Sequence, residues 1–197
     1  VKPTGVELPG EAAALVKSPE RAGWYPFDLA VNSFGQGISV TPLQMAAAVA
    51  AVANGGTLMK PFVVQEIIGP SGRRTFAPAV VRQVIRADTA RVLTDMLVAV
   101  VETVEDGQPR LSKVAGYRLA GKTGTSEIPT ERGYAKDATI ASFAGFGPVD
   151  SPRFVILVKI DRPRDSQWGE AVAAPVFGSL ARQLLVYYRI PPETPAP

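Results

Sequence analysis

The sequence predicts a protein of the α+β class, with an antiparallel sheet of at least three strands and helices packed on its faces. Late in the chain, three short apolar runs follow one another with only loops or turns between them, which is the order of an antiparallel sheet. Longer segments before and after these runs carry apolar residues at helical spacing. The expected strands are 117–125, 140–146 and 153–160, and the expected main helices are 42–53, 88–104 and 171–188.

Composition excludes several kinds of chemistry. The 197 residues suffice for one domain, and 46% hydrophobic with 20% charged residues is ordinary for a soluble globular protein. The net charge of +3 is small and no run of Lys or Arg occurs, so we expect no nucleic-acid partner. The chain has no Cys and no His, which excludes disulfides, thiolate zinc sites and a Ser-His-Asp triad. We therefore expect neither a metal nor a cofactor, and no apolar run reaches the ~20 residues of a membrane helix.

Residues 1–30 are rich in Pro and Gly, which predicts an extended surface segment with turns. Three aromatic residues near its end, Trp24, Tyr25 and Phe27, are expected to anchor this segment to the core.

The first long helix has signals at both ends. Thr41 is an N-cap, Pro42 takes the first helical position, and Gln44 can close a capping box. The segment ends at Asn-Gly-Gly over 54–56, a left-handed C-terminal signal. Because its many alanines permit close packing, we expect this helix to be buried.

Between the first two helices, 62–68 and 80–85 are expected strands and 70–73 is an expected turn. Asp88 can cap the second helix, and Asp-Gly-Gln-Pro over 106–109 is expected to end it. One face of this helix is apolar, with Val92, Leu93, Met96, Leu97, Val100 and Val104.

The strand 153–160 is apolar on both faces, which predicts a central strand covered on both sides. The last helix tolerates Pro175 only in its first turn. Its expected sheet-facing residues are Ala173, Val176, Phe177, Leu180, Leu184 and Tyr188. We expect one domain over 1–190 and a disordered tail over 191–197.

The polar run Gly121-Lys122-Thr123-Gly124-Thr125 follows an apolar approach, and a polar loop is expected from 126 to 139. Lysine supplies a compact charge with three donors, and the threonines supply hydroxyls. Gly124 lacks a side chain, so a ligand backbone can lie close to the strand. This combination suits an anion or a developing oxyanion, while the plainer interpretation is a strand end with ordinary polar residues.

Several blocks together resemble one protein family. In order they are Pro3 to Glu11, Ser33-Phe34-Gly35-Gln36-Gly37, Thr41-Pro42-Leu43-Gln44, Asn54-Gly55-Gly56, Gly121 to Thr125, and Ala173-Ala174-Pro175-Val176-Phe177. This series resembles the C-terminal part of the transpeptidase domain of class B penicillin-binding proteins. The resemblance implies a partial β-lactamase/transpeptidase-like fold, in which the upstream strands and the nucleophile's helix are missing from this chain.

The resemblance also implies serine acyl transfer to and from peptidoglycan stem peptides that end in D-Ala-D-Ala, with β-lactams acylating the same serine. Lys122 would hold the serine of the family's second motif, Ser-x-Asn, and would set the electrostatic potential of the cleft. Thr123 would shape the strand. The Thr125 hydroxyl would meet the substrate carboxylate, and its backbone N–H would complete the oxyanion hole. Ser126 and Glu127 are further candidates for substrate binding, and Tyr134 is a candidate for the rim of the cleft.

The chain departs from the family pattern at two motifs. It contains no Ser-x-x-Lys and no Ser-x-Asn. Three residues after Ser18, Ser71 and Ser179 the chain has Arg21, Arg74 and Arg182 in place of Lys. Arginine does not readily lose a proton and is a poor base. We therefore expect a piece of a transpeptidase domain that carries one wall of the cleft, lacks the nucleophile and is inactive alone.

Three alternatives remain open at this stage: a penicillin-sensing receptor domain, a non-catalytic scaffold that has lost its serine, and a serine β-lactamase. The resemblance further implies a parent protein at the periplasmic or outer face of the cell membrane, anchored by a helix upstream of this chain. A polytopic glycosyltransferase is the implied protein partner. Division and elongation enzymes are not separated by these residues.

Overall fold

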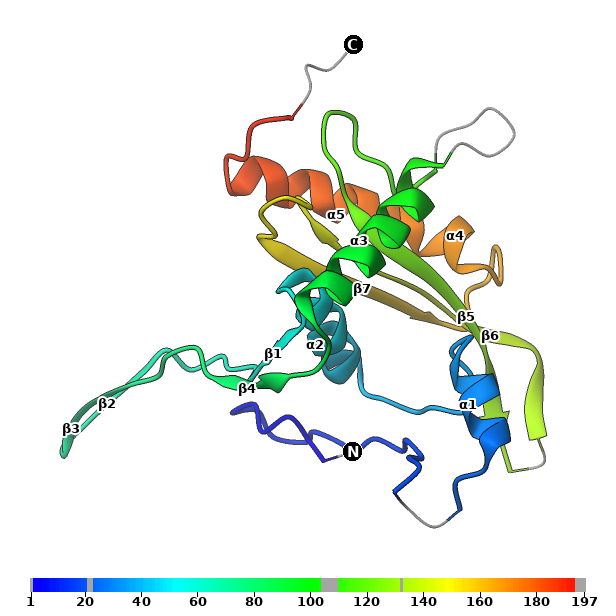
Figure 1. Cartoon of the computed structure of the whole chain (residues 1–197), viewed down its shortest axis with the longest axis horizontal. Helices are drawn as coiled ribbons and strands as arrows, with labels where there is room; N and C mark the ends of the chain where they lie inside the picture. The colour runs from blue at the N-terminus through cyan, green and yellow to red at the C-terminus, as the bar shows by residue number, and fades with distance from the viewer. Residues whose placement is uncertain (1, 21–22, 104–109, 132, 194–197) are drawn as a thin grey trace.

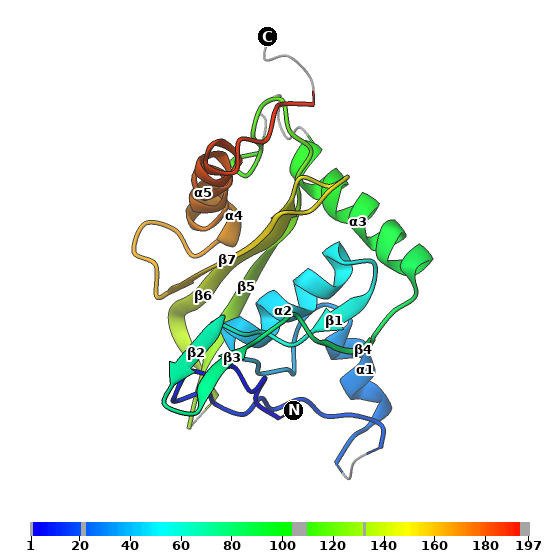
Figure 2. The same cartoon turned by 90° about the vertical axis from the view of Figure 1, so that its left-hand side faces the viewer.

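Three long strands form the sheet that organises the fold (Figure 1). The structure, a computed structural model, describes residues 2–20, 23–103, 110–131 and 133–193. Strands β5 (Ala120–Thr130), β6 (Gly133–Gly147) and β7 (Phe154–Asp161) pair antiparallel in the order β5-β6-β7. Helix α5 (Ala174–Tyr187) covers one face, and α2 (Pro42–Ala53) and α3 (Ala87–Glu102) lie on the other side (Figure 2). The predicted α+β class is confirmed.

The core lies between the sheet and α5. Phe143 of β6 and Phe177 of α5 are both fully buried, and their ring centroids lie 4.6 Å apart. Burying two such aromatic side chains is among the larger favourable contributions in a domain of this size. This contact fixes α5 on the sheet, as the sequence predicted.

The β5–β6 hairpin is longer than expected. The predicted loop over 126–139 is wrong, because Ser126 pairs with Ile140 and Glu127 with Thr139. After a register shift, the pairing continues to Thr130 and Gly133. Polar side chains do not prevent pairing of the backbone N–H and C=O groups, so the ladder extends beyond the apolar part of both strands.

Strand β7 differs from its predicted position. Both of its faces are covered, since α2 and α5 each contact it, as expected. However, within the described residues β7 pairs only with β6, so β6 is the central strand and the predicted central place of β7 is wrong. A strand with two apolar faces is expected to be covered on both faces, but this pattern does not show whether both of its edges pair with other strands.

Helix α2 has the predicted ends. The Thr41 hydroxyl accepts from the Gln44 N–H at 3.2 Å, and the Gln44 side-chain oxygen accepts from the Thr41 N–H at 2.9 Å. Gly55 and Gly56 follow with φ of 61° and 89°. The expected burial is wrong, because Ala51 is the only buried residue of the helix. Helix α2 contacts β6 and β7, and it lines an open groove together with β1 (Thr57–Met59) and the start of β7.

Short strands occupy the region between α2 and α3. Strand β1 pairs with β4 (Val80–Gln83), and β2 (Glu66–Gly69) pairs with β3 (Gly72–Thr75). The β2–β3 hairpin projects away from the body (Figure 1). The strand expected over 62–68 therefore begins later, the strand expected over 80–85 ends at Gln83, and the expected turn at 70–73 falls within the hairpin.

Helix α3 begins at Ala87 with Arg86 as N-cap, so Asp88 is not the N-cap residue. Its Oδ1 nevertheless accepts the Thr89 N–H of the first turn at 2.8 Å. The helix ends at Glu102, and the stop signal predicted over 106–109 lies outside the described residues. Its C-terminal end packs on β5, where Val101 is fully buried. The apolar residues nearer its start, Val92, Leu93 and Met96, are exposed.

The N-terminal segment contains helix α1 (Pro26–Asn32), where only turns and extended chain were expected. The predicted anchoring is wrong for Tyr25 and Phe27, whose exposed fractions are 66% and 73%, while Trp24 is half-buried. An ion pair lies within the segment itself and joins Lys17 to α1. The Lys17 ammonium donates to Asp28 Oδ1 at 2.9 Å, and the Tyr25 N–H donates to Asp28 Oδ2 at 2.8 Å.

The last predicted helix is divided. Helix α4 (Gly169–Val172) precedes α5, which begins at Ala174 and carries Pro175 in its first turn. Proline interrupts a continuous helix by removing a donor, which places the break here. The buried stripe of α5 is partly the predicted one, because Val176, Leu180 and Tyr188 are exposed. Its buried residues are Ala174, Phe177, Gly178, Ala181 and Leu185.

At the C-terminus, residues 194–197 of the predicted disordered tail lie outside the described residues. Glu193, the last described residue, donates its N–H to the Gly116 carbonyl at 2.8 Å.

Candidate functional site

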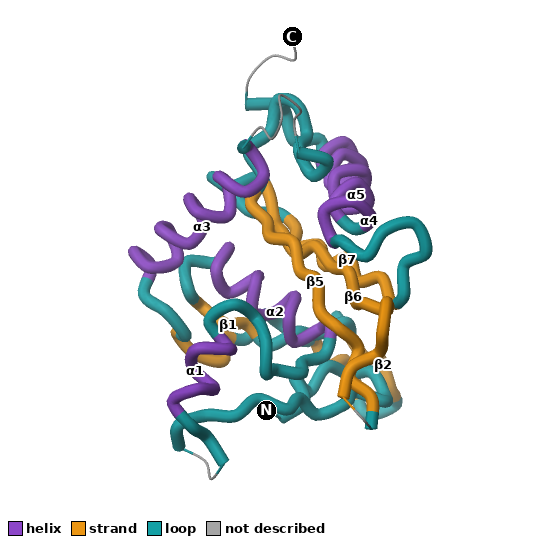
Figure 3. The backbone as a smooth tube through the Cα atoms, turned by 90° about the vertical axis from the view of Figure 1, so that its right-hand side faces the viewer, coloured by secondary structure: helices purple, strands orange, loops and turns teal. Residues whose placement is uncertain are grey.

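The predicted motif lies on β5, at one side of the sheet. Strand β5 pairs with β6 along one edge, and its other edge faces no strand among the described residues. Figure 3 shows β5 between α3 on one side and α4–α5 on the other. An open strand edge presents backbone N–H and C=O groups that can pair with an extended ligand as an added strand.

Lys122 and Thr123 lie side by side on this strand. The Lys122 side chain is exposed, and its ammonium donates to the Thr123 carbonyl at 3.3 Å and to the Thr123 hydroxyl at 3.2 Å. Both acceptors belong to the adjacent residue, so this lysine remains directed along its own strand. Its charge is therefore available at the site for an anionic group.

The two glycines of the motif are needed by the sheet itself. A Cβ atom on Gly124 would lie 2.5 Å from the Ser142 hydroxyl on β6, and one on Gly121 would overlap the Phe143 ring. Gly124 pairs directly with Ser142. The expectation that Gly124 leaves room for a ligand stays a prediction, and packing against Ser142 is a second reason for glycine here.

Thr125 is half-buried and contacts the start of α4. Its hydroxyl oxygen accepts the Gly169 N–H at 3.1 Å. Gly169 is buried and packs directly on the strands at this point. The motif is thus fixed from the side of the sheet that carries α4 and α5.

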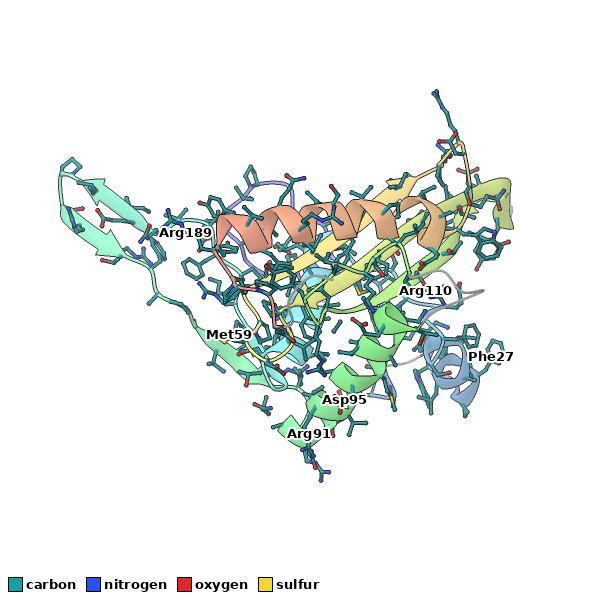
Figure 4. The ribbon with its side chains drawn as sticks, turned by 90° about the horizontal axis from the view of Figure 1, so that it is seen from above. Phe27, Met59, Arg91, Asp95, Arg110 and Arg189 are labelled. Carbon is teal, nitrogen blue, oxygen red and sulfur yellow. The ribbon has the colours of Figure 1, made fainter. Side chains whose placement is uncertain are left out.

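A cavity of about 320 Å³ lies beside the first two motif residues. Its walls come from the C-terminal end of α3, from β5 and from the first turn of α4. Arg110 and Glu170 face each other there, with Nη1 and Oε1 3.8 Å apart. Figure 4 places Arg110 near the end of α3 that approaches the sheet. The lining residues are Ala99, Val100, Thr103, Arg110, Lys122, Thr123 and Glu170.

The other predicted residues do not line this cavity. Ser126 is half-buried and Glu127 exposed, and both lie further along β5. Tyr134 is exposed and pairs with Pro129 in the distal part of the hairpin. The structure therefore brings Lys122 and Thr123 to the cavity. The other predicted residues, Gly124, Thr125, Ser126, Glu127 and Tyr134, are not among those that line it.

Sequence reasoning missed Arg110, Glu170 and Gly169. Arg110 follows a segment with no periodic signal, and nothing in its neighbours indicates a site. Gly169 lies two residues before the expected start of the last helix at 171, which was the one available signal. Within the described residues, no three His, Cys, Asp or Glu side chains gather as a metal site would require.

Comparisons with known proteins agree on one family. The family model for the penicillin binding protein transpeptidase domain matches residues 2–182. Stage V sporulation protein D of Bacillus subtilis is 39% identical over 194 residues, which cover 96% of this chain and 29% of that protein. Penicillin-binding protein PbpB of Mycolicibacterium smegmatis is 37% identical, with 95% and 30% covered.

Solved structures give the same result. Penicillin binding protein 3 of Mycobacterium tuberculosis in complex with ampicillin superimposes with a TM-score of 0.86 at 34% identity, covering 99% of this chain and 45% of that one. The transpeptidase domain of Burkholderia pseudomallei penicillin-binding protein 3 gives 0.80 at 31% identity, covering 98% and 55%. This chain spans less than a third of the length of the curated relatives described above.

Proposed function

Because this chain belongs to the penicillin-binding protein transpeptidase family, we propose that it supplies the Lys-Thr-Gly wall of a serine-type peptidoglycan D,D-transpeptidase. The reaction is acyl transfer: a serine attacks the D-Ala-D-Ala carbonyl, D-Ala leaves, and an amine of a second stem peptide resolves the acyl-enzyme. The chain has no Ser-x-x-Lys or Ser-x-Asn, so the proposal assigns the nucleophile to residues outside this sequence and expects the isolated chain to be inactive.

One observation carries this proposal: the motif stands on a strand whose outer edge faces no other described strand, beside a cavity that Lys122 and Thr123 line. A peptide laid along β5 would place its carbonyl next to the N–H groups of the strand. In this arrangement Lys122 supplies positive charge and Thr125 supplies a backbone N–H for the oxyanion. One such donor is worth about 10²–10³ in rate.

We propose stem peptides and β-lactams as ligands of the complete site. The relative from Mycobacterium tuberculosis has been solved in complex with ampicillin and with aztreonam. Both classes of ligand present a carbonyl to a serine and a negative charge to the cleft, and the cations at this site match that charge. Ser126 and Glu127 are the proposed further contacts along β5.

The proposed location is the outer face of the cell membrane, with an anchoring helix and a polytopic glycosyltransferase partner belonging to the whole protein. In the described part of this chain, no helix is both long enough and apolar enough to cross a membrane. Fractionation of cells that produce the whole protein tests the location, and co-purification tests the partner.

Covalent labelling by a fluorescent penicillin, read by intact mass, tests the function. The chain is compared with the longer protein that includes the preceding residues. We expect the drug's mass on the longer protein alone, and Lys122→Ala in that protein should slow labelling by about tenfold or more. Stoichiometric labelling of the isolated chain would show that one of its own serines reacts. Absence of label on both would favour the scaffold alternative.

A further inference from the structure

Thr125 is joined to a residue far along the chain. The Gly169 N–H donates to the Thr125 hydroxyl oxygen at 3.1 Å, which connects the first residue of α4 with the last residue of the motif on β5. Strand β5 and helix α4 are in contact along this line. The hydrogen bond therefore belongs to a packed junction and not to a loop that approaches from solvent.

The junction requires glycine at position 169. A Cβ atom there would lie 2.5 Å from the Ser142 carbonyl oxygen and 2.6 Å from the Gly124 carbonyl oxygen. Both atoms belong to the backbone of the paired strands β5 and β6, so neither can move away by a simple rotation. Any side chain at this position must push α4 off the strand and lengthen the hydrogen bond to Thr125.

A second contact holds the segment before Gly169. The Thr139 hydroxyl donates to the Gln167 carbonyl at 2.9 Å, and Thr139 is itself buried. Thr139 lies on β6, opposite Glu127 of β5. The segment 167–169 is thus fixed on two neighbouring strands, which keeps the Gly169 N–H aimed at Thr125.

The direction of this hydrogen bond determines what Thr125 can do. A threonine hydroxyl has one proton to donate and two lone pairs that accept. Because one lone pair already accepts the Gly169 N–H, the arrangement favours use of the hydroxyl as a donor. The natural acceptor is an anionic oxygen of a ligand on the outer edge of β5.

We propose that Gly169 is a positioning residue for Thr125: its N–H orients the hydroxyl as a donor to a ligand carboxylate, and its missing side chain permits this approach. The inference rests on the proposed function, because it takes the ligand to bind along β5. It adds a residue from a different part of the chain to the proposed site, and it gives a structural reason why the Thr125 hydroxyl can act as a donor.

The test uses the full-length protein that contains this chain, with Thr125→Val, Gly169→Ala and the double variant. The measured quantity is the second-order rate of acylation by a penicillin, divided by the rate for its methyl ester, which lacks the negative charge. We expect each single substitution to lower this ratio by about tenfold, as for loss of one hydrogen bond to a charged group. The double variant should lower it no further, since Gly169 acts through the Thr125 hydroxyl.

The inference is overturned if the double variant lowers the rate ratio by the product of the two single effects. Such independent effects would mean that Gly169→Ala causes a general packing defect and does not act through Thr125. An unchanged ratio in Gly169→Ala would also overturn the inference. If Gly169→Ala does not fold, Thr139→Val decides, because it adds no bulk and releases the segment before Gly169. A drop of about twofold or more supports the inference, and an unchanged ratio overturns it. Failure of the unsubstituted protein to be labelled would instead overturn the proposed function, and this inference with it.

Discussion

The Nη1 atom of Arg110 lies 3.8 Å from the Oε1 atom of Glu170, at the cavity that Lys122 also lines. The exposed fractions of the two side chains are 24% and 29%. Ion pairs with this much access to solvent contribute little to stability, about 1 kcal/mol at most. Their position beside Lys122 matters more, because the pair sets the local charge that an anionic ligand meets.

Replacing the carboxylate of this pair should favour anionic ligands. In Glu170→Gln, the cavity beside Lys122 loses the negative charge of Glu170. We expect acylation by an anionic penicillin to become about two- to fivefold faster at low ionic strength, and the gain to shrink as salt is added. The second-order acylation rate of the full-length protein, measured across a salt series, checks this.

Asp95→Asn is the matched control, because it changes the net charge equally on the exposed outer side of α3 (Figure 4). It should leave the rate within about 1.5-fold of the unsubstituted protein. Equal acceleration by both substitutions would mean that net charge acts and that the position of Glu170 does not.

Gly124→Ala should destabilise the sheet through Ser142. The added Cβ would lie 2.5 Å from the Ser142 hydroxyl, so either the Ser142 side chain must rotate or one of the two strands must shift. We expect a loss of about 1–3 kcal/mol in the free energy of unfolding, measured with urea.

A second substitution tests the cause. The Ser142 Cβ would be 3.9 Å from the new methyl group, which is ordinary contact, so adding Ser142→Ala should restore most of the lost stability. Ser142→Ala alone is the control. If the double variant is as unstable as Gly124→Ala, the cost comes from the backbone of β5 instead.

The parts of the fold that sequence reasoning predicted well are those set by local contacts. The Thr41 and Gln44 side chains accept hydrogen bonds from backbone N–H groups within one turn. The start of α2 can therefore be predicted from residues 41–44 alone. The strand position of Lys122 to Thr125 was equally local, since apolar residues precede it and pair across to β6.

The errors concern contacts between distant segments. Pairing of Glu127 with Thr139 depends on backbone geometry and leaves no trace in hydrophobicity. The face that α5 turns toward the core depends on how the helix packs on the sheet. As a result Phe177 is buried, while the adjacent Val176 is exposed. The cavity pair unites Arg110 with a residue of α4, and no local rule relates them.

Stability should depend on pH through Asp28. The Lys17 ammonium, followed by the Tyr25 N–H, holds the pKa of this carboxyl below its ordinary value. A carboxyl with a lowered pKa in the folded state contributes stability above its unfolded pKa, about 3.9, and loses it as the pH falls through the folded value. Asp28→Asn should therefore melt at a lower temperature than the unsubstituted protein near neutral pH, and the two should converge in acid.

Melting temperatures followed by circular dichroism over a pH series check this dependence. Asp165→Asn, in the exposed loop before α4, is the control and should show no such convergence. A difference for Asp28→Asn that stays constant into acid would contradict the role of its charge.

Phe177 should be the most sensitive position of α5. Its side chain is fully buried, and its ring centroid lies 4.6 Å from that of Phe143 on the sheet. Phe177→Ala leaves a cavity between helix and sheet that neither element can close, and we expect it to cost about 3–5 kcal/mol in urea unfolding. Val176→Ala changes the adjacent residue, which is 40% exposed, and should cost less than about 1 kcal/mol. Because both substitutions shorten an apolar side chain within one turn of the same helix, helix propensity cannot explain a difference between them. Comparable losses at both positions would mean that α5 presents a different face to the sheet.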